Sequence, residues 1–427
     1  MTDKNKQLVS TISDDNKLTL SLKDIEMPQP GADEVVVRME AMPLNPSDFG
    51  VMFSAADMST AVQSGTDDSP IITADVPAKF MPSLKTRVNK DTPVGNEGAG
   101  TVVAAGSSEA AQALMGKMVA VIGGGTYRQY HCVNVRSCIE MKDGTTATEA
   151  ASSFVNPLTS LAMVETMRAE GHKAIVHAAA ASSLGQMLNR ICMADGVDLV
   201  NIVRKDSQEK LLRDMGAKYV VNSSSETFLA DLTAAIAETG ATISFDPIGG
   251  GQLSSDILNC MEAAITRDVE EYSVYGSNTF KQAYIYGALD RGPITLNRNF
   301  GFSWGVNGFL LFNALGKLGT KTVVKMRQRV AEEITTTFAS SYTHEVTLEE
   351  ALQLKSIAAY GKQATFEASS RSSLVIIEKQ ISMMSAFLCL TKSHRHFVFT
   401  HNLHKLHQKN HAIPILEQGN QMPKVIN

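Results

Sequence analysis

The pattern of apolar and polar positions predicts alternating buried strands and amphipathic helices from residue 173 onward. Residues 174–177, Ala-Ile-Val-His, form a short apolar run typical of a strand buried in a parallel sheet. Further along, five apolar residues fall on one helical face: Leu184, Met187, Leu188, Ile191 and Cys192. Gly196 ends this predicted helix, and residues 197–203 read as the next strand. The order strand, helix, strand predicts an α/β domain with a doubly wound parallel sheet.

The turn between the first strand and the helix is built from small residues. Positions 178–183 hold no side chain larger than serine, and Ser183 with Gln186 has the spacing of a capping box that would start the helix. The unpaired N–H groups of a helix start attract anions, so we expect a diphosphate there. The predicted contacts are Ala180, Ser182, Ser183, Leu184 and Gly185. Only Gly185 remains of the usual glycine pattern, and a simple helix cap explains the two serines nearly as well.

The end of the second predicted strand indicates which cofactor is bound. Dinucleotide sites for NAD usually have an acidic residue about 20 positions after the glycine turn. Here Arg204 and Lys205 stand at that distance from Gly185, and they suit a 2′-phosphate. The sequence therefore favours NADPH. The alternative is a solvated basic pair, with Asp206 left to hold the ribose.

The first 150 residues read as β-rich. Residues 34–40, EVVVRME, alternate in the manner of a half-buried strand, and glycines at 95, 98, 100 and 106 fit a curved strand. Residues 51–92 are polar and too long for an ordinary connection. We expect them to form either a functional or a mobile loop.

Several motifs together resemble the medium-chain dehydrogenase/reductase superfamily, in its zinc-free quinone oxidoreductase and 2-enoyl thioester reductase branch. They are NPSD at 45–48, GNEGAGTVVAAG at 95–106, VNPLTS at 155–160 and FDPIGGG at 245–251. The resemblance runs from about residue 8 to about residue 364. It implies a chaperonin-10-like β-barrel catalytic domain combined with a Rossmann domain. We expect the catalytic domain at 1–155 and 306–365, the NADP-binding domain at 156–305 and an atypical tail at 366–427.

The resemblance also implies roles for individual residues. Asn45 and Asp48 would orient the nicotinamide ribose and the substrate, while the residues beside the nicotinamide would be Asn156, Thr159, Tyr286 and Gly287. Asn45 could instead build only a turn before Pro46, and Asn156 could simply start a helix. Activity would be hydride transfer from NADPH to a quinone or an α,β-unsaturated carbonyl compound. The alternative is an NADPH-binding protein without turnover.

Zinc and a proton donor are the two missing parts of the expected site. Where zinc-dependent relatives have cysteine and histidine, this chain has Asn45 and Asn96, so we expect no metal. Glu97 is expected to hydrogen-bond the barrel backbone. The loop tyrosine of enoyl thioester reductases has no counterpart after NPSD, and Tyr127, the first tyrosine, is better explained as a packed aromatic. No catalytic acid is assigned.

Composition limits the partners. With 39 basic against 44 acidic residues, the chain offers no basic field for nucleic acid or membrane. Five cysteines show no paired spacing, and no apolar run of about 18 residues or apolar leader is present. We expect a cytoplasmic homodimer with a small-molecule substrate.

The last 62 residues depart from the family pattern. From Phe366 onward the glycine and final strand expected by the resemblance are absent, and six of the ten histidines gather between 394 and 411. Residues 375–390 either dock in place of the lost strand or stay loose. A histidine-rich tract can bind metal, but we expect only adventitious binding here.

Overall fold

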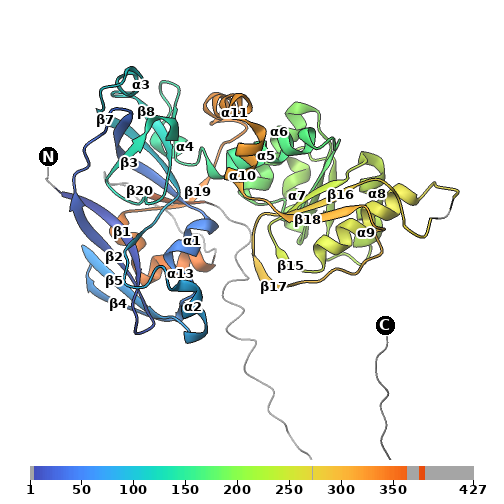
Figure 1. The fold of residues 1–427 in the computed structure, drawn as a ribbon, viewed down its shortest axis with the longest axis horizontal. Helices are drawn as coiled ribbons and strands as arrows, with labels where there is room; N and C mark the ends of the chain where they lie inside the picture. Colours follow the sequence, from blue (N-terminus) through green and yellow to red (C-terminus); the bar gives the residue numbers. More distant parts are fainter. Residues whose placement is uncertain (1–3, 272, 363–374, 380–427) are drawn as a thin grey trace, which may run out of the picture. The chain divides into compact units, whose positions relative to one another are not determined.

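The computed structural model describes residues 4–271, 273–362 and 375–379. Its central feature is a six-stranded sheet in which every neighbouring pair is parallel (Figure 1). The strands lie in the order β13 (Tyr219–Asn222), β12 (Leu199–Val203), β11 (Ile175–His177), β14 (Ile243–Asp246), β16 (Lys281–Ile285) and β18 (Trp304–Gly308). The chain order reverses between β11 and β14, so this is the doubly wound arrangement that the sequence predicted.

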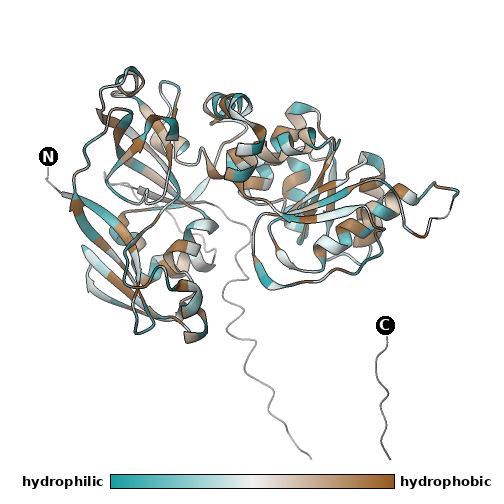
Figure 2. Cartoon of the chain, viewed as in Figure 1, coloured by the Kyte–Doolittle hydropathy of each residue, from teal (hydrophilic) through white to brown (hydrophobic). Residues whose placement is uncertain are grey.

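The strand β11 at the centre of this sheet is apolar on both faces, which is why it reads as a continuous hydrophobic run. Ile175 packs with α5 (Val155–Ala169) and α6 (Ser183–Asp195), while its neighbour Val176 packs with α8 (Phe228–Thr239) and α9 (Leu253–Thr266). Successive strand residues point to opposite faces, so each face receives alternate side chains. Figure 2 shows hydrophobic residues on the strands and mixed faces on the helices.

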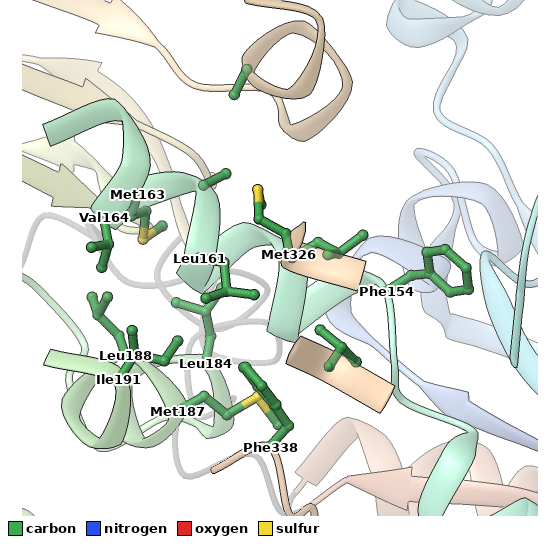
Figure 3. Close-up of a cluster of buried hydrophobic side chains, with 14 of the residues drawn as sticks. Phe154, Leu161, Met163, Val164, Leu184, Met187, Leu188, Ile191, Met326 and Phe338 are labelled. Carbon is green, nitrogen blue, oxygen red and sulfur yellow. The ribbon is translucent and has the colours of Figure 1, made fainter. Parts of the chain in front are cut away.

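The remaining elements of this half connect the strands or continue the chain after β18. They are α7 (Asp206–Asp214), β15 (Gly249–Gly251), β17 (Asp290–Ile294), α10 (Leu311–Leu318) and α11 (Thr320–Glu333). β15 pairs with β17 in a small parallel ladder. Met326 of α11 and Phe338 join the buried cluster of α5 and α6 (Figure 3).

The N-terminal part consists of two largely antiparallel sheets, consistent with a chaperonin-10-like domain. One has the order β4 (Asp57–Thr66), β5 (Ser69–Asp75), β2 (Lys17–Glu26), β1 (Lys4–Ile12) and β6 (Thr92–Pro93). The other has the order β10 (Cys138–Glu140), β8 (Met118–Ile122), β7 (Glu97–Ala105), β3 (Glu34–Leu44), β20 (Val375–Lys379) and β19 (Tyr342–Val346), with β9 (Tyr130–Asn134) also on β3. Short helices complete it: α1 (Pro46–Met52), η1 (Ala78–Phe80), α2 (Met81–Leu84), α3 (Glu109–Ala113), η2 (Val135–Ser137) and α4 (Ala147–Ala150).

The prediction that residues 51–92 form a loop was wrong. β4 and β5 make an antiparallel hairpin, and β5 pairs in turn with β2. Ile72, Ala74 and Val76 are buried there, whereas most of β4 is exposed. Because β4 has no fully buried residue, its sequence carries little alternation, and its place in the sheet depends mainly on pairing with β5.

In the C-terminal region, the returning segment contains two helices, α12 (Leu348–Ala351) and α13 (Leu354–Lys362), and one expectation is corrected. The final strand of the sheet is present, because β20 pairs in parallel with β3 and antiparallel with β19. Of the two alternatives for the tail, docking is therefore the one seen for residues 375–379. The six tail histidines lie outside the described residues.

None of the helices in the described residues is long and apolar enough to span a bilayer. Within the same residues, histidine, cysteine and acidic side chains do not gather in groups of three or more that could hold a metal ion.

Candidate functional site

The turn between β11 and α6 is tight and is closed by a serine cap. Ser182 has extended dihedral angles (φ −65°, ψ 163°), and its Oγ accepts the N–H of Gly185 at 3.2 Å. The prediction of a box formed by Ser183 and Gln186 was wrong by one position. α6 already begins at Ser183, and Gln186 Nε2 instead donates to the Ala181 carbonyl at 2.9 Å. An extended residue directly before the first helical one is the position that caps a helix.

Small residues are required in this turn for steric reasons. A Cβ at Gly185 would lie 2.2 Å from the Ala180 carbonyl oxygen, so only glycine lets the helix approach the turn this closely. Ala179 has φ +56°, a left-handed conformation that glycine adopts more easily than alanine. Ala180, Ala181 and Leu184 are buried. The turn is a close-packed backbone cradle at the start of a helix of 13 residues.

Arg204 and Lys205 follow β12 directly, and both side chains are exposed. Their backbone is fixed: the N–H groups of both residues donate to Gln208 Oε1, at 3.0 and 3.2 Å. The hydroxyl of Ser224 donates to the Arg204 carbonyl at 2.9 Å. The two cationic side chains therefore start from an ordered backbone at the carboxyl edge of the parallel sheet.

The carboxyl ends of β11, β14 and β16 bring together three polar side chains. His177 is fully buried, and its Nε2 lies 2.8 Å from the hydroxyl of Tyr286. Burial lowers the pKa of His177 to about 3, so this imidazole is neutral at physiological pH. Asp246 is also fully buried and accepts the Ile248 N–H at 2.7 Å and the Ser254 hydroxyl at 3.0 Å.

Sequence reasoning selected Tyr286 and Gly287 at this edge but missed His177 and Asp246. A Cβ at Gly287 would lie 2.5 Å from the Pro247 carbonyl oxygen, which explains the glycine. The missed signal was positional. His177 and Asp246 are the last residues of two adjacent parallel strands, where ligands of such sheets bind.

Asn45 and Asp48 lie at the start of α1, and both are almost completely inaccessible, with 1% and 0% of their surface exposed. Asp48 Oδ2 accepts the backbone N–H of Asn45 at 2.7 Å. Burial raises the pKa of Asp48 to about 7, and the nearby carboxylate of Glu97 adds to the shift. Tyr127 is fully buried and donates to the Pro43 carbonyl at 2.8 Å, so it is a packed aromatic, as predicted.

Glu97 hydrogen-bonds backbone groups, as predicted, and these lie at the end of the predicted catalytic segment 1–155. Its Oε2 accepts the N–H groups of Phe154 and Val155 at 2.9 and 3.0 Å, at the start of α5. Its Oε1 accepts the side-chain amide of Asn45 at 2.9 Å. The side-chain contact with Asn45 was not predicted.

Asn156 and Thr159 lie in the first turns of α5; Asn156 is half-buried and Thr159 is buried. The Thr159 hydroxyl bonds to the Val155 carbonyl within the helix. The next residue, Ser160, contacts the Leu184 carbonyl of α6 through its hydroxyl at 3.2 Å. A chain of hydrogen bonds thus links Asn45, Glu97, the start of α5 and the start of α6.

Comparisons with known proteins agree with this architecture. No protein-family model matches the chain. It is 29% identical over 210 residues to a quinone oxidoreductase of Pseudomonas aeruginosa, covering 48% of this chain and 55% of that protein. It is 25% identical over 287 residues to a mitochondrial enoyl-acyl-carrier-protein reductase of Xenopus tropicalis, covering 65% of this chain and 68% of that protein. The match thus spans only about half the length of the Pseudomonas relative.

Solved structures share the fold over most of the chain. A Mesorhizobium loti protein named as a candidate NADPH:quinone reductase superposes with a TM-score of 0.63. The superposition covers 89% of this chain and 99% of that one at 22% sequence identity. At that identity the likeness establishes the fold alone.

Proposed function

Because the chain belongs to the medium-chain dehydrogenase/reductase superfamily, in its quinone oxidoreductase and enoyl thioester reductase branch, we propose that it is an NADPH-dependent reductase. Its substrate would be a quinone or an α,β-unsaturated carbonyl compound, and it would act without zinc. The observation that carries the proposal is the turn before α6, where Gly185 lets a helix of 13 residues begin directly against the Ala180 carbonyl, so that a helix N-terminus follows a backbone of small residues.

The cradle fits the cofactor in shape and charge. The backbone from Ala180 to Gly185 would hold the diphosphate, aided by the hydroxyls of Ser182 and Ser183. Arg204 and Lys205, exposed at the end of the next strand, would bind the 2′-phosphate. Bound NADPH would supply the hydride.

The nicotinamide would lie between the two predicted groups of residues, Asn156 with Thr159 and Tyr286 with Gly287. The hydrogen bond between Tyr286 and the neutral His177 supports this by holding the tyrosine ring at the sheet edge. Asn45 and Asp48 would act on the substrate side. Their part would be to orient the reactants, since placement contributes much of the rate of a hydride transfer.

The donor set supports zinc-free chemistry. Asn45 and Asn96 stand where zinc ligands would be needed, and their amides are used in hydrogen bonds, to Glu97 at 2.9 Å and to Ser47 Oγ at 3.0 Å.

The test is the pair of substitutions Arg204→Ala and, as a control on the same surface, Lys210→Ala. A hydrogen bond to a charged group contributes about 1.5–3 kcal/mol, so Arg204→Ala should raise the Kd for NADPH about 10- to 150-fold. The Kd for NADH should stay the same for both variants, because NADH lacks the 2′-phosphate. Equal weakening of the two cofactors would refute the role of Arg204.

The complete burial of Asn45 and Asp48 favours a second candidate, an NADPH-binding protein without turnover. Side chains that are 1% and 0% exposed can touch a substrate only after a local rearrangement. NADPH oxidation measured against quinones, enals and enoyl thioesters separates the two. Flat traces together with saturable NADPH binding would support the second candidate.

We further propose a homodimer located in the cytoplasm. Light scattering during gel filtration would measure the mass of the assembly, and a mass of one chain would contradict it. Fractionation of cells expressing the protein would test the location.

A further inference from the structure

The N-terminus of α5 is capped by a carboxylate from a distant strand. Phe154, the residue before the helix, makes no side-chain cap, and the first two N–H groups instead donate to Glu97 Oε2. Glu97 begins β7 and is 0% exposed. An ionised acceptor at a helix start satisfies donors that would otherwise be unpaired and interacts favourably with the helix dipole.

The second oxygen of the same carboxylate fixes Asn45. Glu97 Oε1 accepts the Asn45 side-chain amide at 2.9 Å, and the Ser152 hydroxyl lies 3.4 Å away. An ionised carboxylate only accepts hydrogen bonds, so Asn45 must present its NH₂ group to Glu97. One buried side chain therefore holds the start of α1 and the start of α5 at a set separation.

The constraint continues from α5 into the proposed diphosphate cradle. Ser160 of α5 contacts the Leu184 carbonyl in the first turn of α6. Leu161 and Leu184 also belong to the same buried cluster, drawn in Figure 3. A shift of α5 would thus move Asn156 and Thr159 together with the cradle.

We propose that Glu97 is a positioning residue that sets the distance between the substrate-side Asn45 and the cofactor-side helix α5. This role rests on the proposed reductase function and adds to it a specific determinant of hydride-transfer geometry.

The principal test is Glu97→Asp. The carboxyl group of this variant lies one CH₂ closer to the backbone of β7, so it cannot reach the Asn45 amide and the N–H groups of Phe154 and Val155 at their present distances. Asn45 should therefore move relative to α5. A misplacement of about 1 Å can cost on the order of 100-fold in rate, so we expect kcat to fall about 10- to 100-fold. The Kd for NADPH should change less than about twofold, because the cradle is intact.

The readout that separates positioning from simple structural damage is the primary isotope effect with NADPH deuterated at the transferred position. Partial unfolding reduces the amount of active protein but leaves the isotope effect per turnover unchanged. Misplacement slows the hydride step itself and should raise the isotope effect on kcat. Glu165→Gln, on the same helix, is the matched control and should leave both values unchanged. If Glu97→Asp does not fold, Glu97→Ala removes all three contacts, and the same changes in kcat and in the isotope effect are expected.

The outcomes are distinct. An unchanged isotope effect and an unchanged kcat per folded molecule in the Glu97 variant would overturn the positioning role while leaving the proposed function standing. If the wild-type protein binds NADPH but none of the acceptors supports its oxidation, the reductase function is contradicted. The positioning role then fails as well.

Discussion

The buried carboxyl group of Asp48 should make the stability of this protein depend on pH. Asp48 is 0% exposed, and burial raises its pKa from 3.8 to about 7. The folded state therefore holds a proton on Asp48 at pH values where the unfolded chain has released it. This tighter binding of the proton stabilises the folded state fully below about pH 4, and the stabilisation is lost as the pH rises to about 7. A shift of about 3 pKa units corresponds to about 4 kcal/mol.

The variant Asp48→Asn isolates this effect, since an amide does not titrate in this range. Unfolding by urea, followed by circular dichroism from pH 4 to pH 8, gives the free energy of unfolding of both proteins. We expect the variant to be about as stable as the wild type at pH 4 and more stable at pH 8, by up to about 4 kcal/mol. Asp143→Asn, at an exposed position, is the control and should follow the wild-type curve. Parallel curves for Asp48→Asn and the wild type would refute the reasoning.

Three further substitutions test the cradle and the buried ion pair. Ala179→Gly should stabilise the protein by up to about 1 kcal/mol, because it relieves a left-handed alanine at the cost of a more flexible unfolded chain; a lower Tm would contradict this. Ser182→Ala removes the cap of α6 and should lower the free energy of unfolding, measured with urea, by about 1 kcal/mol. It should also raise the Kd for NADPH measured by calorimetry. Lys281→Met should lower the free energy of unfolding by about 3–5 kcal/mol, because it leaves the buried carboxylate of Glu262 without the ammonium group that contacts it at 2.6 Å. A loss below about 1 kcal/mol would show that the two contacts of Ser277 with Glu262 are sufficient.

The parallel sheet could be predicted from sequence because its signal is local. Ile175 and Val176 are buried on opposite faces of one strand, so the strand had to be apolar throughout. Gly196 and Gly240 adopt left-handed conformations at the ends of α6 and α8, as expected for glycines that end helices.

The errors arose where distant segments decide the structure. The β4–β5 hairpin is held in the sheet by the pairing of β5 with β2, which lies about 50 residues earlier in the chain. The hairpin's own residues show little alternation of apolar and polar side chains. The sequence left open whether residues 375–390 dock in the sheet, because the partner of β20, strand β3, lies more than 300 residues away. The hairpin and β20 are held by backbone hydrogen bonds to neighbouring strands, and such hydrogen bonds can form with many different side chains.

The site shows the same division. The cradle residues were found because they are contiguous, and only the cap was displaced, from Ser183 to Ser182. The contacts of Glu97 with Asn45 and with the start of α5 join segments 52 to 58 residues apart, and no spacing in the sequence predicts them. His177 and Asp246 meet the sheet edge only because β11 and β14 are neighbours.

The most direct test of the central claim is calorimetric titration of the full chain with NADPH and with NADH. The cradle before α6 and the cations after β12 predict saturable binding of NADPH at one site per chain, at least about 10-fold tighter than binding of NADH. No saturable binding of either nucleotide would contradict the account.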